Sequence, residues 1–197
     1  AVACSRRVRI WRPLRRRLTM QHVQLEAAKV VSSVLQGRNL TQVLTESLRQ
    51  HPQFSAQQRG ALQDMCYGTL RHYGRLVFML NKLMERPARD ELLQHLLLVA
   101  LYQLEFSKVG QHVIVDQAVR ASKLLSATAG GLVNAVLRNF QRKREALLEA
   151  ANHNDESRYS YSQWWIDAVR KQYGERAHAI LETGNQHPPM ALRVNTR

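Results

Sequence analysis

The sequence predicts an all-α fold, and three observations support that prediction. Apolar residues recur at the three- and four-residue spacing of a helix face through most of the chain. Short breaks marked by glycine or proline separate these segments, and no convincing strand pattern occurs before about residue 185. We expect about seven helices in an orthogonal or bundled arrangement over residues 21–151, followed by a short helical segment and one strand.

The first three expected helices have recognisable starts or stops. Residues 27–35 carry an apolar stripe, and Gly37 supplies the stop because glycine accepts the left-handed conformation that often ends a helix. We expect Thr41 to cap a second, short helix. Ser55 and Gln58 have the spacing of a capping box, which predicts the start of the third helix.

The most apolar segment lies in the middle of the chain. A fourth helix over residues 76–84 is expected to end before Pro87, and Asp90 opens the next one. This fifth helix is apolar around nearly its whole circumference, as expected of a central buried helix. Its apolar residues are Leu92, Leu93, Leu96, Leu97, Val99, Ala100, Leu101 and Leu104.

Two more helices complete the predicted helical domain. After a break at Gly110, residues 115–122 form an apolar helix face, and residues 132–149 form the last helix. We expect Ala129 and the double glycine that follows it to form a bare turn between these two helices.

The composition changes after residue 151. Residues 152–157 are read as a polar linker, and helices are expected near residues 163–173 and 175–184. The His-Pro-Pro sequence at 187–189 requires extended backbone, and residues 190–195 alternate as a strand would. Because a lone strand leaves both edges unpaired, we expect the chain to be a fragment of a longer protein.

The chain is strongly basic. Its 29 lysines and arginines exceed its 15 acidic residues, which gives a formal net charge of +14. The first twenty residues hold seven arginines and no acidic residue, so residues 21–197 still carry +7. Such a surplus predicts attraction to polyanions, most often nucleic acid and sometimes an anionic membrane.

Residues 1–20 form a basic tail without a periodic apolar face, and we predict that they are disordered. Three interpretations are open: a mitochondrial transit peptide, a basic arm that grips phosphates, or residues upstream of a true start at Met20. We favour the last two, because the helical pattern begins only after Met20.

The sequence lacks the motifs of a membrane-spanning helix, a cofactor site and a metal site. The longest apolar run, residues 96–102, is about a third of the ~20 residues that a membrane-spanning helix needs. No phosphate-binding loop, dinucleotide glycine motif or zinc spacing occurs, so we predict no catalytic, cofactor or metal site in this chain. Cys4 and Cys66 suggest no disulfide framework, which favours the reducing cytoplasm, and Cys66 is expected in the core. His95 is expected to be a hydrogen-bonded residue of the core or its boundary rather than a metal ligand.

The positive signal for function is a set of cations at helix-face spacing, with one more in the expected strand. These residues would neutralise phosphates and release counterions, so RNA affinity should fall steeply with salt. For any one of them a solvated helix face is an equally good interpretation. The predicted RNA-binding residues are Arg71, Arg75, Lys82, Arg138, Arg142, Lys143 and Arg193.

Aromatic residues offer a second way of binding RNA. Tyr67, Tyr73 and Tyr102 can stack on unpaired bases, but their helical spacing beside leucines favours packing in the core. Trp164 and Trp165 are expected in an interface or the core, because the apolar face continues beyond them.

Three sequence blocks carry a family resemblance. The stretch GGLVNAVLR at residues 130–138 looks like the signature helix of the NusB family of RNA-binding antitermination domains. The stretches YGTLR at 67–71 and LYQL at 101–104 resemble the two other recurrent blocks of that family. Together these blocks span roughly residues 23–151, and the resemblance implies a NusB-like all-α RNA-binding domain.

The remainder resembles a second family. Trp164-Trp165, the turn at Tyr173-Gly174 and the stretch HPPMALRVN at 187–195 are similar to the start of the methyltransferase region of RsmB (Sun/Fmu) rRNA cytosine-C5 methyltransferases. Those enzymes carry a NusB-like domain ahead of an S-adenosylmethionine-dependent catalytic domain. The resemblance implies a parent enzyme that methylates carbon 5 of a cytosine in small-subunit ribosomal RNA, which this chain would recognise.

The catalytic features of that family have no counterpart here. Its chemistry uses one cysteine that adds to the base and a second that aids product release, and Cys4 and Cys66 match neither motif. Its glycine-rich cofactor loop is missing too, so S-adenosylmethionine is expected only in the missing catalytic domain. Two alternatives remain: a stand-alone NusB-type antitermination factor that binds RNA with a protein partner, and an interaction scaffold whose charge serves solubility alone.

Overall fold

The computed structural model describes residues 19–186 and 191–194, and its first seven α-helices cover Met20–Asn152. The predicted all-α fold and its seven helices are confirmed. These helices are α1 Met20–Leu35, α2 Leu40–Gln50, α3 Ala56–Arg71, α4 Tyr73–Leu83, α5 Glu91–Phe106, α6 Gln111–Leu125 and α7 Ala129–Asn152. The remaining helices are α8 Asp155–Tyr159, α9 Gln163–Tyr173, the 3-10 turn η1 Gly174–Arg176 and α10 Ala177–Gly184.

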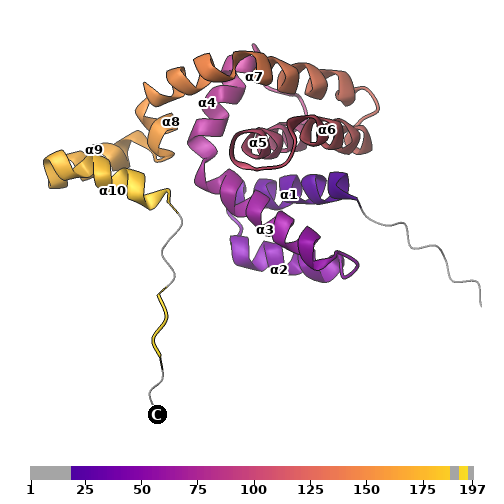
Figure 1. Ribbon diagram of the computed structural model, residues 1–197, viewed down its shortest axis with the longest axis horizontal. Helices are drawn as coiled ribbons and strands as arrows, with labels where there is room; N and C mark the ends of the chain where they lie inside the picture. The colour runs from indigo at the N-terminus through magenta and orange to yellow at the C-terminus, as the bar shows by residue number, and fades with distance from the viewer. Residues whose placement is uncertain (1–18, 187–190, 195–197) are drawn as a thin grey trace, which may run out of the picture.

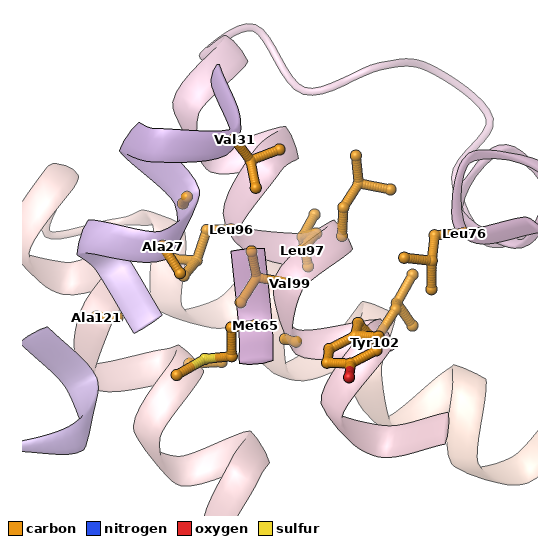
Figure 2. Close-up of a cluster of buried hydrophobic side chains, with 14 of the residues drawn as sticks. Ala27, Val31, Met65, Leu76, Leu96, Leu97, Val99, Tyr102 and Ala121 are labelled. Atoms are coloured by element: carbon orange, nitrogen blue, oxygen red, sulfur yellow. The ribbon is translucent and has the colours of Figure 1, made fainter. Parts of the chain in front are cut away.

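Helix α5 is the centre of the main core. In Figure 1 it is seen nearly end-on, with α1 below it and α7 above it, and it contacts α1, α3, α4, α6 and α7. Leu96, Leu97 and Val99 are fully buried, and they lie among side chains from the surrounding helices (Figure 2). The prediction that this apolar helix is central is therefore confirmed.

The expected caps are confirmed at α3 and α5 and wrong at α2. Asp90 caps α5, and its carboxylate accepts from the backbone N–H of Leu92 at 2.9 Å. Ser55 caps α3, and its hydroxyl accepts a hydrogen bond from the Gln58 backbone N–H at 3.2 Å. Helix α2 is capped by Asn39 instead of Thr41, because the Asn39 side chain accepts from the backbone N–H of Gln42. Thr41 lies in the first turn of α2, where its carbonyl oxygen accepts from the Thr45 hydroxyl.

The double glycine is part of a helix, so the prediction of a turn there is wrong. Helix α7 begins at Ala129, and the connection from α6 is only Ser126–Thr128. Gly130 is buried, and a Cβ atom at this position would lie 3.0 Å from Lys123 Cε on α6. A side chain at Gly130 would therefore press against Lys123, which would have to move slightly.

The segment read as a polar linker is largely helical. Asn154 caps α8, and its side-chain oxygen accepts from the backbone N–H of Ser157 at 2.9 Å. A cap of this kind starts a helix from polar residues, which explains why the composition resembled a linker.

The helices from α8 onward have a small core of their own. It contains Tyr159, Ile166, Val169, Ala177 and Leu181, separate from the main cluster around α5. Helix α8 packs on α4 and, less extensively, on α7. These contacts connect the small core to the main one.

The glycine at the start of α4 allows this contact. A Cβ atom at Gly74 would lie 2.6 Å from the backbone oxygen of Glu156 and 3.1 Å from Ser160 Cα. No larger residue fits at Gly74 without moving the backbone of α8.

Some predictions fall at the edges of the described residues. Residues 191–194 form no strand, and Leu192 and Val194 are 78% exposed, which is expected where no neighbouring strand lies alongside them. The other residues of that expected strand, the His-Pro-Pro stretch and residues 1–18 lie outside the described residues.

Two of the family-like sequence blocks pack directly on each other. The ring of Tyr102 on α5 lies over Gly68 on α3, where a Cβ atom would be 2.0 Å from the Tyr102 Cζ atom. The Tyr102 hydroxyl donates to Asp64 Oδ1 at 3.1 Å, and burial raises the pKa of Tyr102 to about 12. Gly68 therefore permits the close approach of α3 to the central helix.

We expect Gly68→Ala to be less stable than Gly131→Ala by about 1–3 kcal/mol, the usual cost of overpacking. Both changes give a similar gain in helix propensity, but a Cβ atom at Gly131 meets no atom within 4 Å. Denaturant unfolding of the two variants measures the difference. Equal stabilities would show that Tyr102 moves aside without cost.

Acid should destabilise the protein through His95. His95 is buried, its Nδ1 has no partner among the described residues, and burial lowers the pKa of its imidazole. The unfolded chain binds this proton near pH ~6.5, whereas the folded protein binds it only at lower pH. The free energy of unfolding should therefore fall as the pH drops below about 6.5.

This pH dependence should be weaker in His95→Gln and unchanged in His153→Gln, whose side chain is exposed. Urea unfolding between pH ~5 and ~7.5 measures it. An unchanged profile in His95→Gln would assign the acid sensitivity to another group.

Candidate nucleic-acid interface

Three of the predicted RNA-binding residues are exposed on α7, and we call this set the α7 face: Arg138, Arg142 and Lys143. Lys143 follows Arg142 directly and projects at about 100° to it around the helix. Arg138 and Arg142 are one helical turn apart, so their side chains project on the same side of α7. All three are exposed, and none forms an ion pair with an Asp or Glu of the described residues. Their charges are therefore available to an anion.

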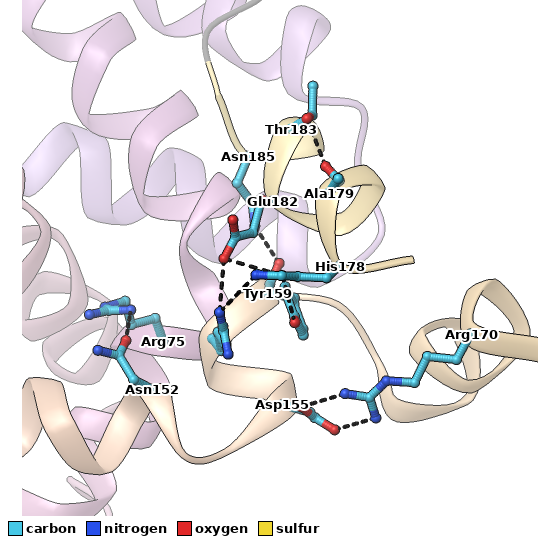
Figure 3. Close-up of polar contacts among 11 residues, drawn as sticks. Arg75, Asn152, Asp155, Tyr159, Arg170, His178, Ala179, Glu182, Thr183 and Asn185 are labelled. Atoms are coloured by element: carbon cyan, nitrogen blue, oxygen red, sulfur yellow. Dashed lines mark hydrogen bonds and ion pairs between the residues drawn. The ribbon is translucent and has the colours of Figure 1, made fainter. Parts of the chain in front are cut away.

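Other surface cations differ, because carboxylates already neutralise them. Arg38 lies 2.7 Å from Glu46, and Arg120 lies 3.0 Å from Asp116. Arg170 holds Asp155 through two nitrogens (Figure 3), and this hydrogen bonding lowers the pKa of the Asp155 carboxyl.

The guanidinium of Arg75 is hydrogen-bonded within the protein. It is half-buried and donates to Asn152 Oδ1 at 3.0 Å, which connects α4 to the end of α7 (Figure 3). Burial lowers the pKa of Arg75, and the carboxylate of Glu105 opposes that effect. Glu105 is itself paired with Arg144 on α7 at 3.0 Å. Arg75 thus has a structural role, and its contact with RNA stays a prediction.

The other three predicted residues lie on separate elements. Arg71 is the last residue of α3 and is half-buried, whereas Lys82 is exposed near the end of α4. The Lys82 ammonium lies 5.6 Å from the centre of the Phe78 ring. Arg193 is exposed in the stretch 191–194. Of the seven predicted residues, three share α7 and two, Arg75 and Lys82, share α4, where Arg75 is half-buried and Lys82 is exposed.

The aromatic residues divide by exposure. Tyr102 is buried, so the expectation of core packing is confirmed for it, but Tyr67 is 45% exposed on α3. Trp164 is 70% exposed and Trp165 is 45% exposed, so neither lies in the core of the described residues. The buried positions of α9 are instead Ile166 and Val169.

Sequence analysis missed a group of polar residues around Tyr67. Ser160, Tyr161 and Asn185 lie beside the end of α3 and help to line a groove there. No motif marks them, because packing of the C-terminal helices brings them to α3. The only sequence signal was Tyr67, which could stack on a base but whose helical spacing favoured the core.

The described residues offer no nucleophile of the kind used for base methylation. Cys66 is fully buried, and burial raises the pKa of its thiol to about 12, with a further contribution from Glu26. A thiol in this environment is a core residue rather than an attacking thiolate, as predicted. Cys4 lies outside the described residues.

The described residues show neither a metal-binding cluster nor a membrane-spanning helix. No group of three or more His, Cys, Asp or Glu side chains is arranged to hold a metal ion. Across the same part of the chain, every helix is too short or too polar to cross a membrane.

Comparison with known proteins explains the fold. Residues 18–142 match the NusB family. The chain belongs to this family. Residues 161–197 match a second description, the RsmF/B-like methyltransferase ferredoxin-like domain.

Its relatives include longer proteins named Ribosomal RNA small subunit methyltransferase B. The chain is 36% identical to that of Proteus mirabilis over 181 residues, which is 90% of this chain and 42% of the relative. It is 38% identical to that of Yersinia pseudotuberculosis over 173 residues, which is 86% of this chain and 39% of the relative. The chain thus spans about two fifths of the length of the relatives it matches.

Cys66 should be unreactive in the folded protein. In a Cys4→Ser background at pH ~8, we expect a thiol reagent to modify Cys66 about a thousandfold more slowly than in denaturant. Burial raises the thiol pKa from 9.0 to about 12, so the folded protein holds far less of the reactive thiolate. Absorbance of the released chromophore measures the rate. Fast modification without unfolding would mean that α3 opens readily and that the thiol can reach solvent.

Proposed function

We propose that this chain is the RNA-recognition part of an S-adenosylmethionine-dependent methyltransferase that modifies a cytosine of small-subunit ribosomal RNA at carbon 5. The observation that carries the proposal is the α7 face, where three exposed cations without carboxylate partners lie on a NusB-family fold. The names of the relatives support the class of RNA.

The proposed division of labour follows from charge. Residues 21–151 would hold RNA by neutralising phosphates, each of which releases counterions as it is contacted. Residues 152–197 would begin the methyltransferase region, and residues 1–20 would add a basic tail. The cofactor would bind in the catalytic part of the parent enzyme, which we expect in the cytoplasm, and we assign it no residue of this chain.

The match of residues 161–197 to a methyltransferase-associated domain favours this function over a stand-alone antitermination factor. A free-standing factor would need no such segment. An interaction scaffold is disfavoured for a different reason, because charge that served solubility alone would not need unpaired cations gathered on one helix.

Neutralising the α7 face should weaken RNA binding and its salt dependence together. For Arg138→Gln, Arg142→Gln and Lys143→Gln combined, we expect the slope of log affinity against log salt to fall by about two to three, since each lost phosphate contact removes ~0.7–0.9. Filter binding of a small-subunit rRNA fragment at several salt concentrations measures this.

The matched control neutralises three cations that already have carboxylate partners: Arg38→Gln, Arg120→Gln and Arg170→Gln. It changes the net charge equally, so a smaller effect would assign binding to the α7 face rather than to total charge. Equal effects would refute the α7 face, and absence of RNA retention at low salt would favour a scaffold. Tight binding of S-adenosylmethionine in calorimetry would contradict a purely RNA-recognising chain.

A further inference from the structure

We propose that a groove between α3 and the C-terminal helices binds one unpaired nucleotide of the RNA. This inference rests on the proposed function and specifies which form of RNA the chain selects. The α3 groove, as we call it, has a volume of about 340 Å³. The lining residues that matter here are Tyr67, Arg71, Ser160, Tyr161, Gly184 and Asn185.

One wall of the groove is α3. Tyr67 and Arg71 are one helical turn apart, so the phenol and the guanidinium lie along the same side of this helix. Tyr67 keeps 45% of its surface exposed, although the adjacent Cys66 and Gly68 are buried. Arg71 forms no ion pair with a carboxylate of the described residues.

The opposite wall is held in place by contacts to the rest of the protein. Ser160 adopts a left-handed backbone conformation with φ of 53°, and its hydroxyl accepts from the backbone N–H of Arg75 at 3.4 Å. The Asn185 side-chain amide donates to the backbone oxygen of Tyr159, beside which it lies in Figure 3. These contacts join the start of α4, the end of α8 and the end of α10.

A glycine shapes the side of the groove that the C-terminal helices form. A Cβ atom at Gly184 would lie 2.3 Å from the Tyr161 hydroxyl oxygen, so a side chain at this position would displace the phenol from α10. The groove is therefore formed before any ligand arrives, which lowers the entropic cost of binding.

The chemistry of the lining fits a nucleotide. An exposed aromatic ring supplies a stacking surface for a base, a guanidinium supplies a partner for phosphate or a second stacking plane, and hydroxyl and amide groups can read base edges. Among the described residues, none of those that line the groove is acidic. The neighbouring groove between α4 and α8 differs, because Glu156 lines it and would repel a phosphate.

The size of the groove limits the ligand. Its volume lies at the lower end of the ~300–1,000 Å³ typical of small-molecule sites, so it accommodates a single nucleotide but not a duplex. A base must be unstacked and unpaired to enter such a site. The α7 face makes no such demand, because phosphates are presented by paired and unpaired RNA alike.

The test uses the whole chain and two fluorescently labelled RNAs, a single-stranded 12-mer and a blunt duplex of the same sequence. For Tyr67→Ala, we expect the dissociation constant for the single strand to rise roughly tenfold, since stacking on one aromatic ring is worth about that much. Duplex affinity should stay within about twofold. Tyr67→Phe should behave as the unchanged chain, because the ring is retained.

Tyr173→Ala is the matched control, because Tyr173 is 47% exposed and lies outside the α3 groove. A second variant, Arg71→Gln, should lower the salt slope for the single strand by about one phosphate contact, whereas Tyr67→Ala should leave this slope unchanged. Circular dichroism confirms that each variant is folded.

The outcomes separate this inference from the proposed function. If Tyr67→Ala binds the single strand as well as the unchanged chain does, while neutralising the α7 face still weakens binding, the groove is refuted and the function stands. Equal losses for single strand and duplex also refute the groove. If the unchanged chain binds neither RNA at low salt, both proposals fail.

Discussion

Burial of α5 is the constraint on which the rest of the structure depends. Helix α5 carries no lysine or arginine, and eleven of its residues are buried. Five other helices must cover it, so each turns its apolar stripe inward and keeps its cations outside. Packing around an apolar helix thus keeps the cations at the surface, because they could not be moved into the core without a large desolvation cost.

Close approaches at glycine connect this core to its surroundings. Gly68 lets the Tyr102 ring rest on α3, and Gly74 lets α8 rest on α4. These are contacts between backbone or ring atoms, and they fix distances more tightly than contacts between flexible side chains. Arg75 adds a polar connection to Asn152 at the same junction. The C-terminal helices are therefore placed by the same helices that carry the predicted RNA-binding cations.

Much of the fold could be predicted from the sequence because helical periodicity is a local property. The helix around Leu96 and the capping box at Ser55 were both visible in this way. Errors arose where the sequence allowed two interpretations of the same segment. Asn39 and Thr41 are both good caps, and only the structure shows that Asn39 reaches the Gln42 N–H. The double glycine resembled a turn, although Gly130 lies within α7 and packs against α6.

The candidate site was less predictable, because it depends on residues that are distant in sequence. Cation spacing alone indicated the α7 face, but it could not show that Arg75 is occupied by Asn152, 77 residues away. Ser160 is still further from Arg75, and no local pattern marks it as the wall of a groove. A pattern of charges thus predicts that a surface attracts RNA, whereas pairing between distant elements decides which of those charges remain available.

Affinity and selection then have different physical sources. Unpaired cations on an exposed helix attract any phosphate backbone, and salt weakens that attraction without changing which RNA is preferred. An aromatic ring beside a guanidinium adds a contact that only an exposed base can make, and stacking depends little on salt. A domain that used charge alone would bind every RNA in the cell with similar affinity. By packing the C-terminal helices on α4 beside α3, the fold would give this protein a means of distinguishing unpaired RNA that no single helix could provide.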